Sequence, residues 1–236
     1  DTVRQRIDFT GATLESEIGA FEAEGHLYLA DYRGGWPSSL VCQVQIQRAT
    51  LSPPDCFAAP LDVDSGTADL RVRLDPFQID FGQIVAHRGD NRYEARGKLG
   101  ADGNGWWIAL DAGFDRADGE EALALWPVAI ENKTRDWVAT HVTGGHVFDG
   151  TLAFRKPPDG KLTMNGTFGM EETVVRPVKG LAPITVDRGY VSLAPKQAVI
   201  AAEVAEMTAP DGAVLDLSGT SYMIPAGRGF LKYGTV

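Results

Sequence analysis

The sequence predicts a mainly β fold: an antiparallel hairpin meander forming an extended twisted β-groove or an open sandwich, with two short helices near residues 119–143. Three observations predict it. Apolar and polar residues alternate with a period of two along many segments, turn-forming residues separate these segments, and only one region has helical spacing. Antiparallel sheets produce this alternation because one face avoids water and the other meets it. Strand-helix-strand alternation is missing, which argues against a parallel nucleotide-binding sheet.

The alternation is clearest in residues 69–75, where Leu70, Val72 and Leu74 are interleaved with charged residues. Residues 42–47 repeat it with glutamines at the polar positions. Other apolar residues that share a face with a near neighbour are Tyr93, Ala95, Leu99, Ile108, Leu110, Phe114, Leu162, Met164, Phe168, Val191, Leu193, Ile200, Ala202, Val204, Leu215 and Leu217.

The predicted connections are tight turns, because Gly and Asn supply the positive φ that such turns need. The 27 glycines fit a chain with many short hairpins. The predicted hairpin turns are 101–105 between strands 92–99 and 106–114, 157–160 between strands 146–155 and 161–169, and 209–212.

The helical region runs from 119 to 143. It begins with an Ala- and Leu-rich run after Glu120, and Asn132 is the predicted N-cap of a second helix that ends at Gly144. Trp126 and Trp137 in this region are expected to pack the helices onto the sheet. The chain therefore divides into an N-terminal β section (1–116), a helical insertion (117–143) and a C-terminal β section (144–236) of one continuous domain, whose tail from Pro225 to Gly229 is expected to leave the sheet.

The composition of this 236-residue chain is that of a globular protein, with 44% hydrophobic and 23% charged residues. A net charge of −10 without a basic cluster argues against nucleic-acid partners and against docking through a polybasic patch. The chain starts at Asp1 without a signal peptide and has no apolar run of 18 residues. We expect a processed protein or a segment of a longer one.

Two cysteines, Cys42 and Cys56, flank a turn that contains Pro53 and Pro54. They could form a disulfide worth roughly 3 kcal/mol, or they could be two free buried thiols. Two cysteines do not fix the compartment, but an oxidising compartment would favour the disulfide.

Motifs for catalysis or metal binding are missing from the sequence. It has no Gly-x-Ser-x-Gly elbow and no phosphate-binding glycine loop. The best metal candidate is His141 with His146 and either His26 or His87, but this spacing fits no known ligand pattern and a structural role is favoured.

Acidic neighbours such as Asp62 with Asp64, or Glu171 with Glu172, could pair for glycoside cleavage, but chance proximity explains them better. We predict no catalytic residue, no metal and no cofactor. The doublet of Trp106 and Trp107 should place its two rings on opposite faces of a strand.

From residue 125 onward the sequence resembles the AsmA-like superfamily of Gram-negative bacteria, specifically its YhdP-type periplasmic domain. The resemblance covers about residues 123–224, and residues 7–116 fit the preceding hairpins by pattern alone. The matching segments are Leu125-Trp126-Pro127, Lys133 to Val138, Thr143 to Val147, Gly150 to Phe154, Gly166 to Phe168, Thr173 to Ile184 and Asp187 to Val191.

The resemblance implies a non-catalytic internal fragment of a long periplasmic protein, anchored in the inner membrane by a segment absent from this chain. It implies a β-groove that binds acyl chains and conducts phospholipid between the inner and outer membranes, a role in outer-membrane biogenesis. The expected partners are phospholipid, or another acyl-chain ligand, and the remainder of the anchored chain.

The expected groove lining consists of apolar residues at alternate strand positions, but a closed core would show the same alternation. An alternative function is a carbohydrate- or peptidoglycan-binding β-sandwich in which Trp36, Trp106 and Trp107 stack on sugars. The expected lining residues are Val44, Ile46, Leu70, Val72, Leu74, Leu110, Leu152, Phe154, Leu162, Met164, Ile200 and Val204.

Overall fold

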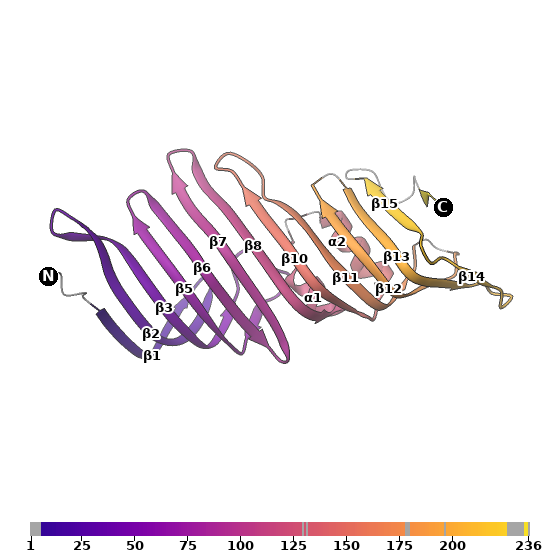
Figure 1. The fold of residues 1–236 in the computed structure, drawn as a ribbon, viewed down its shortest axis with the longest axis horizontal. Helices are drawn as coiled ribbons and strands as arrows, with labels where there is room; N and C mark the ends of the chain where they lie inside the picture. The colour runs from indigo at the N-terminus through magenta and orange to yellow at the C-terminus, as the bar shows by residue number, and fades with distance from the viewer. Residues whose placement is uncertain are drawn as a thin grey trace. The chain divides into compact units, whose positions relative to one another are not determined.

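The fold is known from a computed structural model that describes residues 6–128, 130, 132–177, 180–195, 197–225 and 234–235. The predicted mainly β fold is confirmed: sixteen strands belong to one open antiparallel sheet (Figure 1). Most strands pair with their neighbours in sequence, in the order β1-β2-β3-β5-β6-β7-β8-β10-β11-β12-β13-β15-β16. The short strands β4, β9 and β14 pair with β3, β11 and β13.

The strand bounds agree with the predicted hairpins: the structure has its turns at 103–104, 157–162 and 209–213. The strands are β1 (Arg6–Ser16), β2 (Gly19–Arg33), β3 (Trp36–Leu51), β4 (Leu61–Val63), β5 (Ser65–Leu74), β6 (Phe77–Arg88), β7 (Asn91–Asp102), β8 (Gly105–Asp118), β9 (Val142–Thr143), β10 (His146–Lys156), β11 (Thr163–Val175), β12 (Ile184–Ala194), β13 (Gln197–Thr208), β14 (Val214–Asp216), β15 (Ser221–Pro225) and β16 (Gly234–Thr235). The tail from Pro225 to Gly229 was expected to leave the sheet. Of these residues, only Pro225 lies in the described part.

The chain divides into two compact units. The first unit contains residues 1–113 and 153–163, and the second contains 114–152 and 164–236. This grouping differs from the expected sections in two ways: the helices belong to the second unit, and the hairpin between β10 and β11 belongs to the first.

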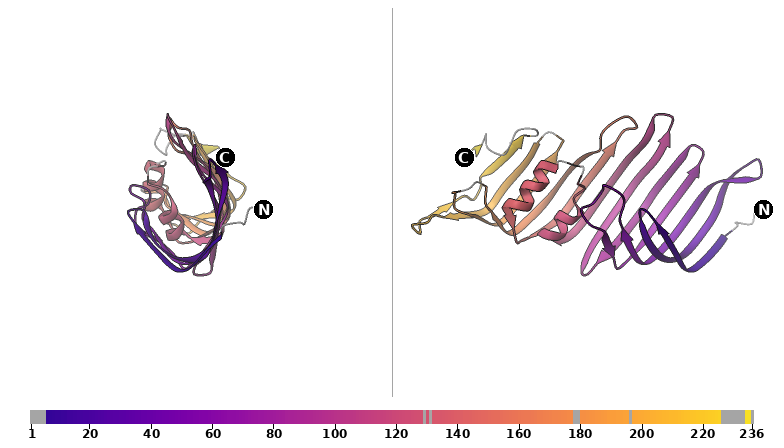
Figure 2. Two further views of the ribbon diagram at one scale, coloured as in Figure 1. Left: turned by 90° about the vertical axis from the view of Figure 1, so that its left-hand side faces the viewer. Right: turned by 180° about the vertical axis from the view of Figure 1, so that it is seen from behind.

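The strands of the first unit are strongly bent, and in Figure 2 its indigo and purple strands trace an arc. The bend has a local cause, because the register shifts in three strand pairs: between Phe9 and Ala12 in β1–β2, between Glu22 and Ala23 in β2–β3, and between Asp69 and Leu70 in β5–β6. Each shift is a β-bulge, and a bulge bends its strand and increases its twist. A row of bulges across neighbouring strands therefore curves this part of the sheet.

The second unit combines a sheet section with the two predicted helices, α1 (Gly119–Leu125) and α2 (Asn132–His141). Asp118 caps α1, because its side chain accepts a 2.7 Å hydrogen bond from the backbone N–H of Glu121. Asn132, predicted to be the cap of α2, is the first residue of that helix, and its side chain lies outside the described part. None of the described helices is long and apolar enough to cross a bilayer.

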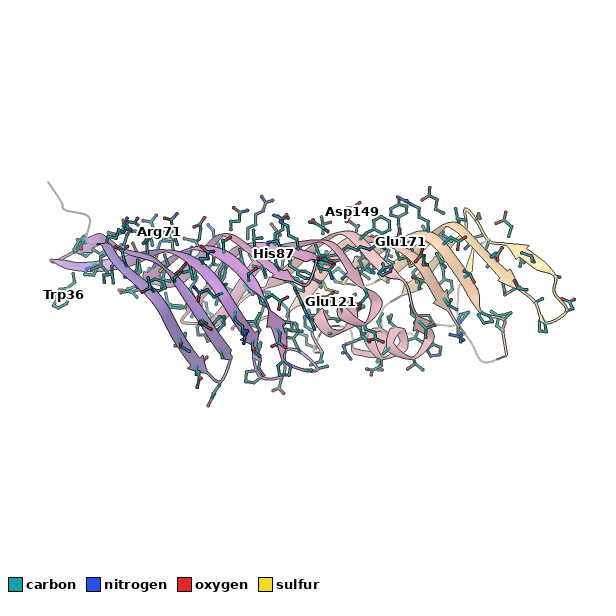
Figure 3. All side chains as sticks on the ribbon, turned by 90° about the horizontal axis from the view of Figure 1, so that it is seen from below. Trp36, Arg71, His87, Glu121, Asp149 and Glu171 are labelled. Carbon is teal, nitrogen blue, oxygen red and sulfur yellow. The ribbon has the colours of Figure 1, made fainter. Side chains whose placement is uncertain are left out.

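The helices cover one face of their sheet section. Figure 3 shows Asp149 and Glu171 projecting from one side of the sheet, while α1, marked by Glu121, lies on the other. On the covered side, Met170, Val186 and Ala205 are buried and form a hydrophobic core with partly buried neighbours. The second unit thus contains a closed core of the usual kind.

Candidate functional site

The strand register divides the side chains of the first unit between two faces, because directly paired residues of an antiparallel sheet point to the same side. Val44 of β3 pairs with Ala68 of β5, and Cys42 pairs with Leu70. Following the paired residues from strand to strand gives one set of side chains on the same side of the sheet, called here the apolar face. It comprises Leu27, Leu29, Leu40, Cys42, Val44, Ile46, Ala68, Leu70, Val72, Leu74, Phe77, Ile79, Phe81, Ile84, Ala86, Tyr93, Ala95 and Leu99.

Glycine allows strands on this face to approach closely. Gly97 has φ of +154°, and a Cβ atom built there would lie 2.1 Å from the carbonyl oxygen of Ala109 and 2.8 Å from the Cα of Leu110. Any side chain at position 97 would therefore clash with the backbone of β8. The same contact places Leu110 opposite Gly97, which lies on the apolar face because it pairs with Phe81.

The opposite face of the first unit is polar. Figure 3 shows Arg71 and His87 projecting from it. The guanidinium of Arg71 donates a 2.6 Å hydrogen bond to the carboxylate of Asp31, and that carboxylate also accepts a hydrogen bond from Ser39. These bonds, with Ser39 the larger contributor, lower the pKa of Asp31 below its ordinary value. A second ion pair joins Arg73 to the carboxylate of Asp80 at 2.9 Å, so this face carries ion pairs of the kind found on solvated surfaces.

The apolar face lacks a covering layer that would bury it. Among the described residues of the first unit, Leu61 is the one large apolar side chain that is fully buried, and Leu61 lies in the short strand β4. The other fully buried apolar residues of this unit are Ala23, Ala49 and Ala68. In the second unit, by contrast, the fully buried apolar residues include Ile130, Met164, Met170, Val186 and Val191.

Side chains of the apolar face therefore remain partly exposed. Leu74, at the end of β5, is 52% exposed, and Trp106, at the start of β8, is 53% exposed. Trp106 contacts Phe77 edge to face, with ring centroids 5.6 Å apart. A contiguous apolar surface of this kind is unusual on a free protein and is typical of an interaction or ligand-binding surface.

The structure brings together most of the expected lining residues that lie in the first unit. Val44, Ile46, Leu70, Val72 and Leu74 share the apolar face by direct register. Leu110 and Phe154 join them: Arg155 bonds to Asp111 on the polar side, so the preceding residue, Phe154, points to the other side. Leu162 lies just before β11 and is partly buried.

The expected lining residues of the second unit have other surroundings. Met164 is 8% exposed, Ile200 packs against the closed core, and Leu152 contacts Gly166 of the neighbouring strand. Val204 lies on the opposite face, contrary to expectation. A bulge at β12 and β13 pairs Val204 with Arg188 and leaves it 46% exposed, whereas Ile200 points toward the core.

Of the two alternatives for the cysteines, the structure has free thiols: Cys42 and Cys56 are both free and partly buried. Cys42 lies in the middle of β3, whereas Cys56 follows the far end of that strand, in the loop that leads to β4. A disulfide needs Cα atoms within about 7 Å, and nine strand residues at about 3.3 Å each separate Cys42 from that end. Burial raises the pKa of both thiols, which makes them less reactive at neutral pH.

Two of the four histidines, His26 and His141, have structural contacts. The Nδ1 atom of His26 lies 2.5 Å from the carboxylate of Asp8, and the Nδ1 atom of His141 lies 2.9 Å from the backbone oxygen of Trp137. Across the residues that the structure describes, His, Cys, Asp and Glu do not gather in any group of three or more that could hold a metal ion.

The tryptophan doublet divides between the two faces, as its alternation predicts. Trp106 lies beside Phe77 on the apolar side, whereas the ring of Trp107 covers Gly100, which pairs with Gln78 on the polar side. The two rings therefore cannot form one flat platform for a sugar. Trp36, at the tip of the β2–β3 hairpin, is 79% exposed.

The tryptophans of the helical region are engaged in local packing. The indole N–H of Trp126 donates a 2.8 Å hydrogen bond to the backbone oxygen of Ile130, which is itself buried. Trp137 stacks on His141 one helical turn later, with ring centroids 4.7 Å apart. Both contacts lie within the helical region, so the expected packing of these tryptophans onto the sheet stays a prediction.

Comparison of the chain with models of protein families, with curated proteins and with solved structures finds no match.

Proposed function

We propose that the apolar face of the first unit binds the acyl chains of lipids, and that the chain is a non-catalytic lipid-binding and lipid-conducting segment. One observation carries the proposal: a broad apolar face that no second layer buries among the described residues of the first unit. A sheet with one apolar face must cover that face with something, and acyl chains match a surface made of aliphatic and aromatic side chains.

The dimensions and energies suit an acyl chain. Strands β1, β2, β3, β5, β6, β7 and β8 are neighbours in the sheet, and at about 4.8 Å per strand they extend roughly 30 Å. One leaflet of a bilayer is about 15 Å of hydrocarbon, so an entire acyl chain fits. Ten buried CH₂ groups gain about 8 kcal/mol before the ligand's lost freedom is subtracted.

The composition of the face favours passage over selection. The side chains of the apolar face from Leu40 to Ala86 carry no charge, and the one cation that the alternation adds, Arg88, lies at the end of β6, so no point along the middle of the face would hold a headgroup tightly. Binding of this kind discriminates little between lipids and allows exchange along the sheet.

The resemblance to the AsmA-like superfamily supplies the biological setting of the proposal. In that setting the chain is part of a longer periplasmic protein, anchored in the inner membrane by a segment outside this sequence, and it conducts phospholipid between the inner and outer membranes.

Mass spectrometry of lipids that co-purify with the chain tests the proposal. The protein is exported to the periplasm, purified without detergent, and its lipid content is measured after extraction. We expect phospholipid or fatty acid at a fixed ratio to protein, and we expect a glutamate at Val72 to reduce that ratio strongly.

The matched control places glutamate at Gln43, which pairs with Asp69 on the polar face and should retain the lipid. Folded wild-type protein without lipid, or equal loss of lipid in both variants, would reject the proposal.

A further inference from the structure

The hairpin tips along one edge of the first unit form a single row, called here the hairpin rim (residues 32–37, 74–77, 101–106 and 156–163). The pairing of Ser39 with Arg73 places the β2–β3 tip beside the β5–β6 tip, and the pairing of Gln78 with Gly100 brings in the β7–β8 tip. The fourth tip follows through a 2.6 Å hydrogen bond from Lys156 Nζ to the backbone oxygen of Trp106. Figure 1 shows these tips side by side.

The hairpin rim concentrates exposed aromatic side chains. Of the seven large apolar residues that are strongly exposed in the described part of this unit, four lie on the rim: Tyr32 at 43%, Trp36 at 79%, Leu74 at 52% and Trp106 at 53%. The remaining three lie in β1 or in its turn to β2. Because these four side chains lie at strand ends next to the turns, they can reach an external surface without any change in the sheet.

The charge of the hairpin rim differs from that of the opposite edge. The rim carries three cationic and three acidic residues, so its net charge is zero. The turns on the opposite edge (16–19, 52–64 and 88–91) carry one cation and five carboxylates, which gives a net charge of −4. In a chain with a net charge of −10, the rim is therefore an edge that an anionic surface does not repel.

We propose that the hairpin rim docks onto a lipid bilayer, with Trp36, Trp106, Tyr32 and Leu74 in the interfacial layer. Trp and Tyr prefer this layer because their rings are apolar and their N–H or O–H groups stay hydrated. Gly34 and Gly35, whose added Cβ atoms would meet nothing within 4 Å, leave space around Trp36 for lipid headgroups.

Docking by the hairpin rim goes beyond the acyl-chain binding proposed above and does not require it. The two are compatible in geometry, because Leu74 and Phe77 end two rows of the apolar face at this rim. A docked rim would thus bring the ends of those rows to the bilayer surface.

Vesicle flotation tests the proposal with the wild-type chain and vesicles of phosphatidylethanolamine with a minor fraction of phosphatidylglycerol. We expect the wild type to float, with little dependence on salt because the rim is neutral. Trp36→Glu should weaken partitioning by about tenfold to a hundredfold, the effect of losing one buried large apolar side chain. Trp36 is highly exposed, so circular dichroism should show an unchanged fold.

The matched control is Ile18→Glu, which adds the same charge at a turn on the opposite edge, where Ile18 is 56% exposed. It should float like the wild type. Brominated lipid should quench the tryptophan fluorescence of the wild type, and this quenching should fall when Trp36 is replaced by Phe. Failure of the folded wild type to float, or equal weakening by both glutamates, would overturn the proposal. A monomeric short-chain lipid tests the apolar face separately, because it can bind without a bilayer. If this lipid binds but the chain does not float, docking by the hairpin rim is wrong while acyl-chain binding by the apolar face stands.

Discussion

A glutamate at Val72 should be far less destabilising than a glutamate at Val186. Both residues lie in β-strands and point to an apolar side of the sheet, but Val186 is 4% exposed within the closed core, whereas Val72 is partly exposed on the apolar face. Burying a carboxyl group at Val186 should cost about 4 kcal/mol or more. At Val72 the carboxylate can reach water, so the loss should be about 1 kcal/mol of cross-strand packing.

The two variants should therefore differ by roughly 3 kcal/mol, which is about 6–12 °C in Tm for a chain of this size. Thermal unfolding followed by far-ultraviolet circular dichroism measures the difference, with urea titration as a second measurement. Equal destabilisation by the two glutamates would refute the reasoning, because Val72 would then lie in a core as closed as that of Val186.

Three further predictions concern local structure. Trp126→Ala should cost about 3–5 kcal/mol of unfolding free energy, since it removes a large ring and leaves the buried carbonyl of Ile130 without its donor; unchanged thermal stability would contradict this. Asp118→Ala should cost about 1 kcal/mol and Asp118→Asn much less, because asparagine still caps α1; an equal loss in urea titration would exclude capping. Natively exported, unreduced and denatured protein should react with two equivalents of thiol reagent, because Cys42 and Cys56 are free; a count of zero would show that they pair.

The alternation in the sequence predicts the strands and their hairpins well because a strand with one wet face needs a period of two. It also predicts the faces of Leu70, Val72 and Leu74. The N-cap Asp118 was not predicted, although Asp118 and Glu121 match the spacing of a capping box.

Bulges explain most of what could not be predicted. Each bulge inserts one residue and exchanges the two faces of the strand beyond it, which moved Val204 away from the face of Ile200. Bulge positions depend on how two strands pair, and neither strand shows this alone. The position of Cys56 depends on where β3 ends: the strand runs to Leu51 and leaves Cys56 in the loop before β4.

Whether an apolar face is covered also cannot be read from alternation, because a closed sandwich and an open face require the same residues. Met164 and Ile200 contribute to a core, whereas Val44 and Leu70 remain partly exposed, although all four occupy alternate strand positions.

Photo-crosslinking from the two faces of one strand tests most directly whether the apolar face binds acyl chains. A photo-reactive residue is placed at Val72 in one variant and at Arg71 in another, with Val44 and Gln43 as a second pair that leaves the ion pair of Arg71 intact. After irradiation in cells, mass spectrometry should find lipid adducts at Val72 and Val44 and none at Arg71 or Gln43. Equal labelling of both faces, or no adduct at any position in folded protein, would contradict lipid binding by this face.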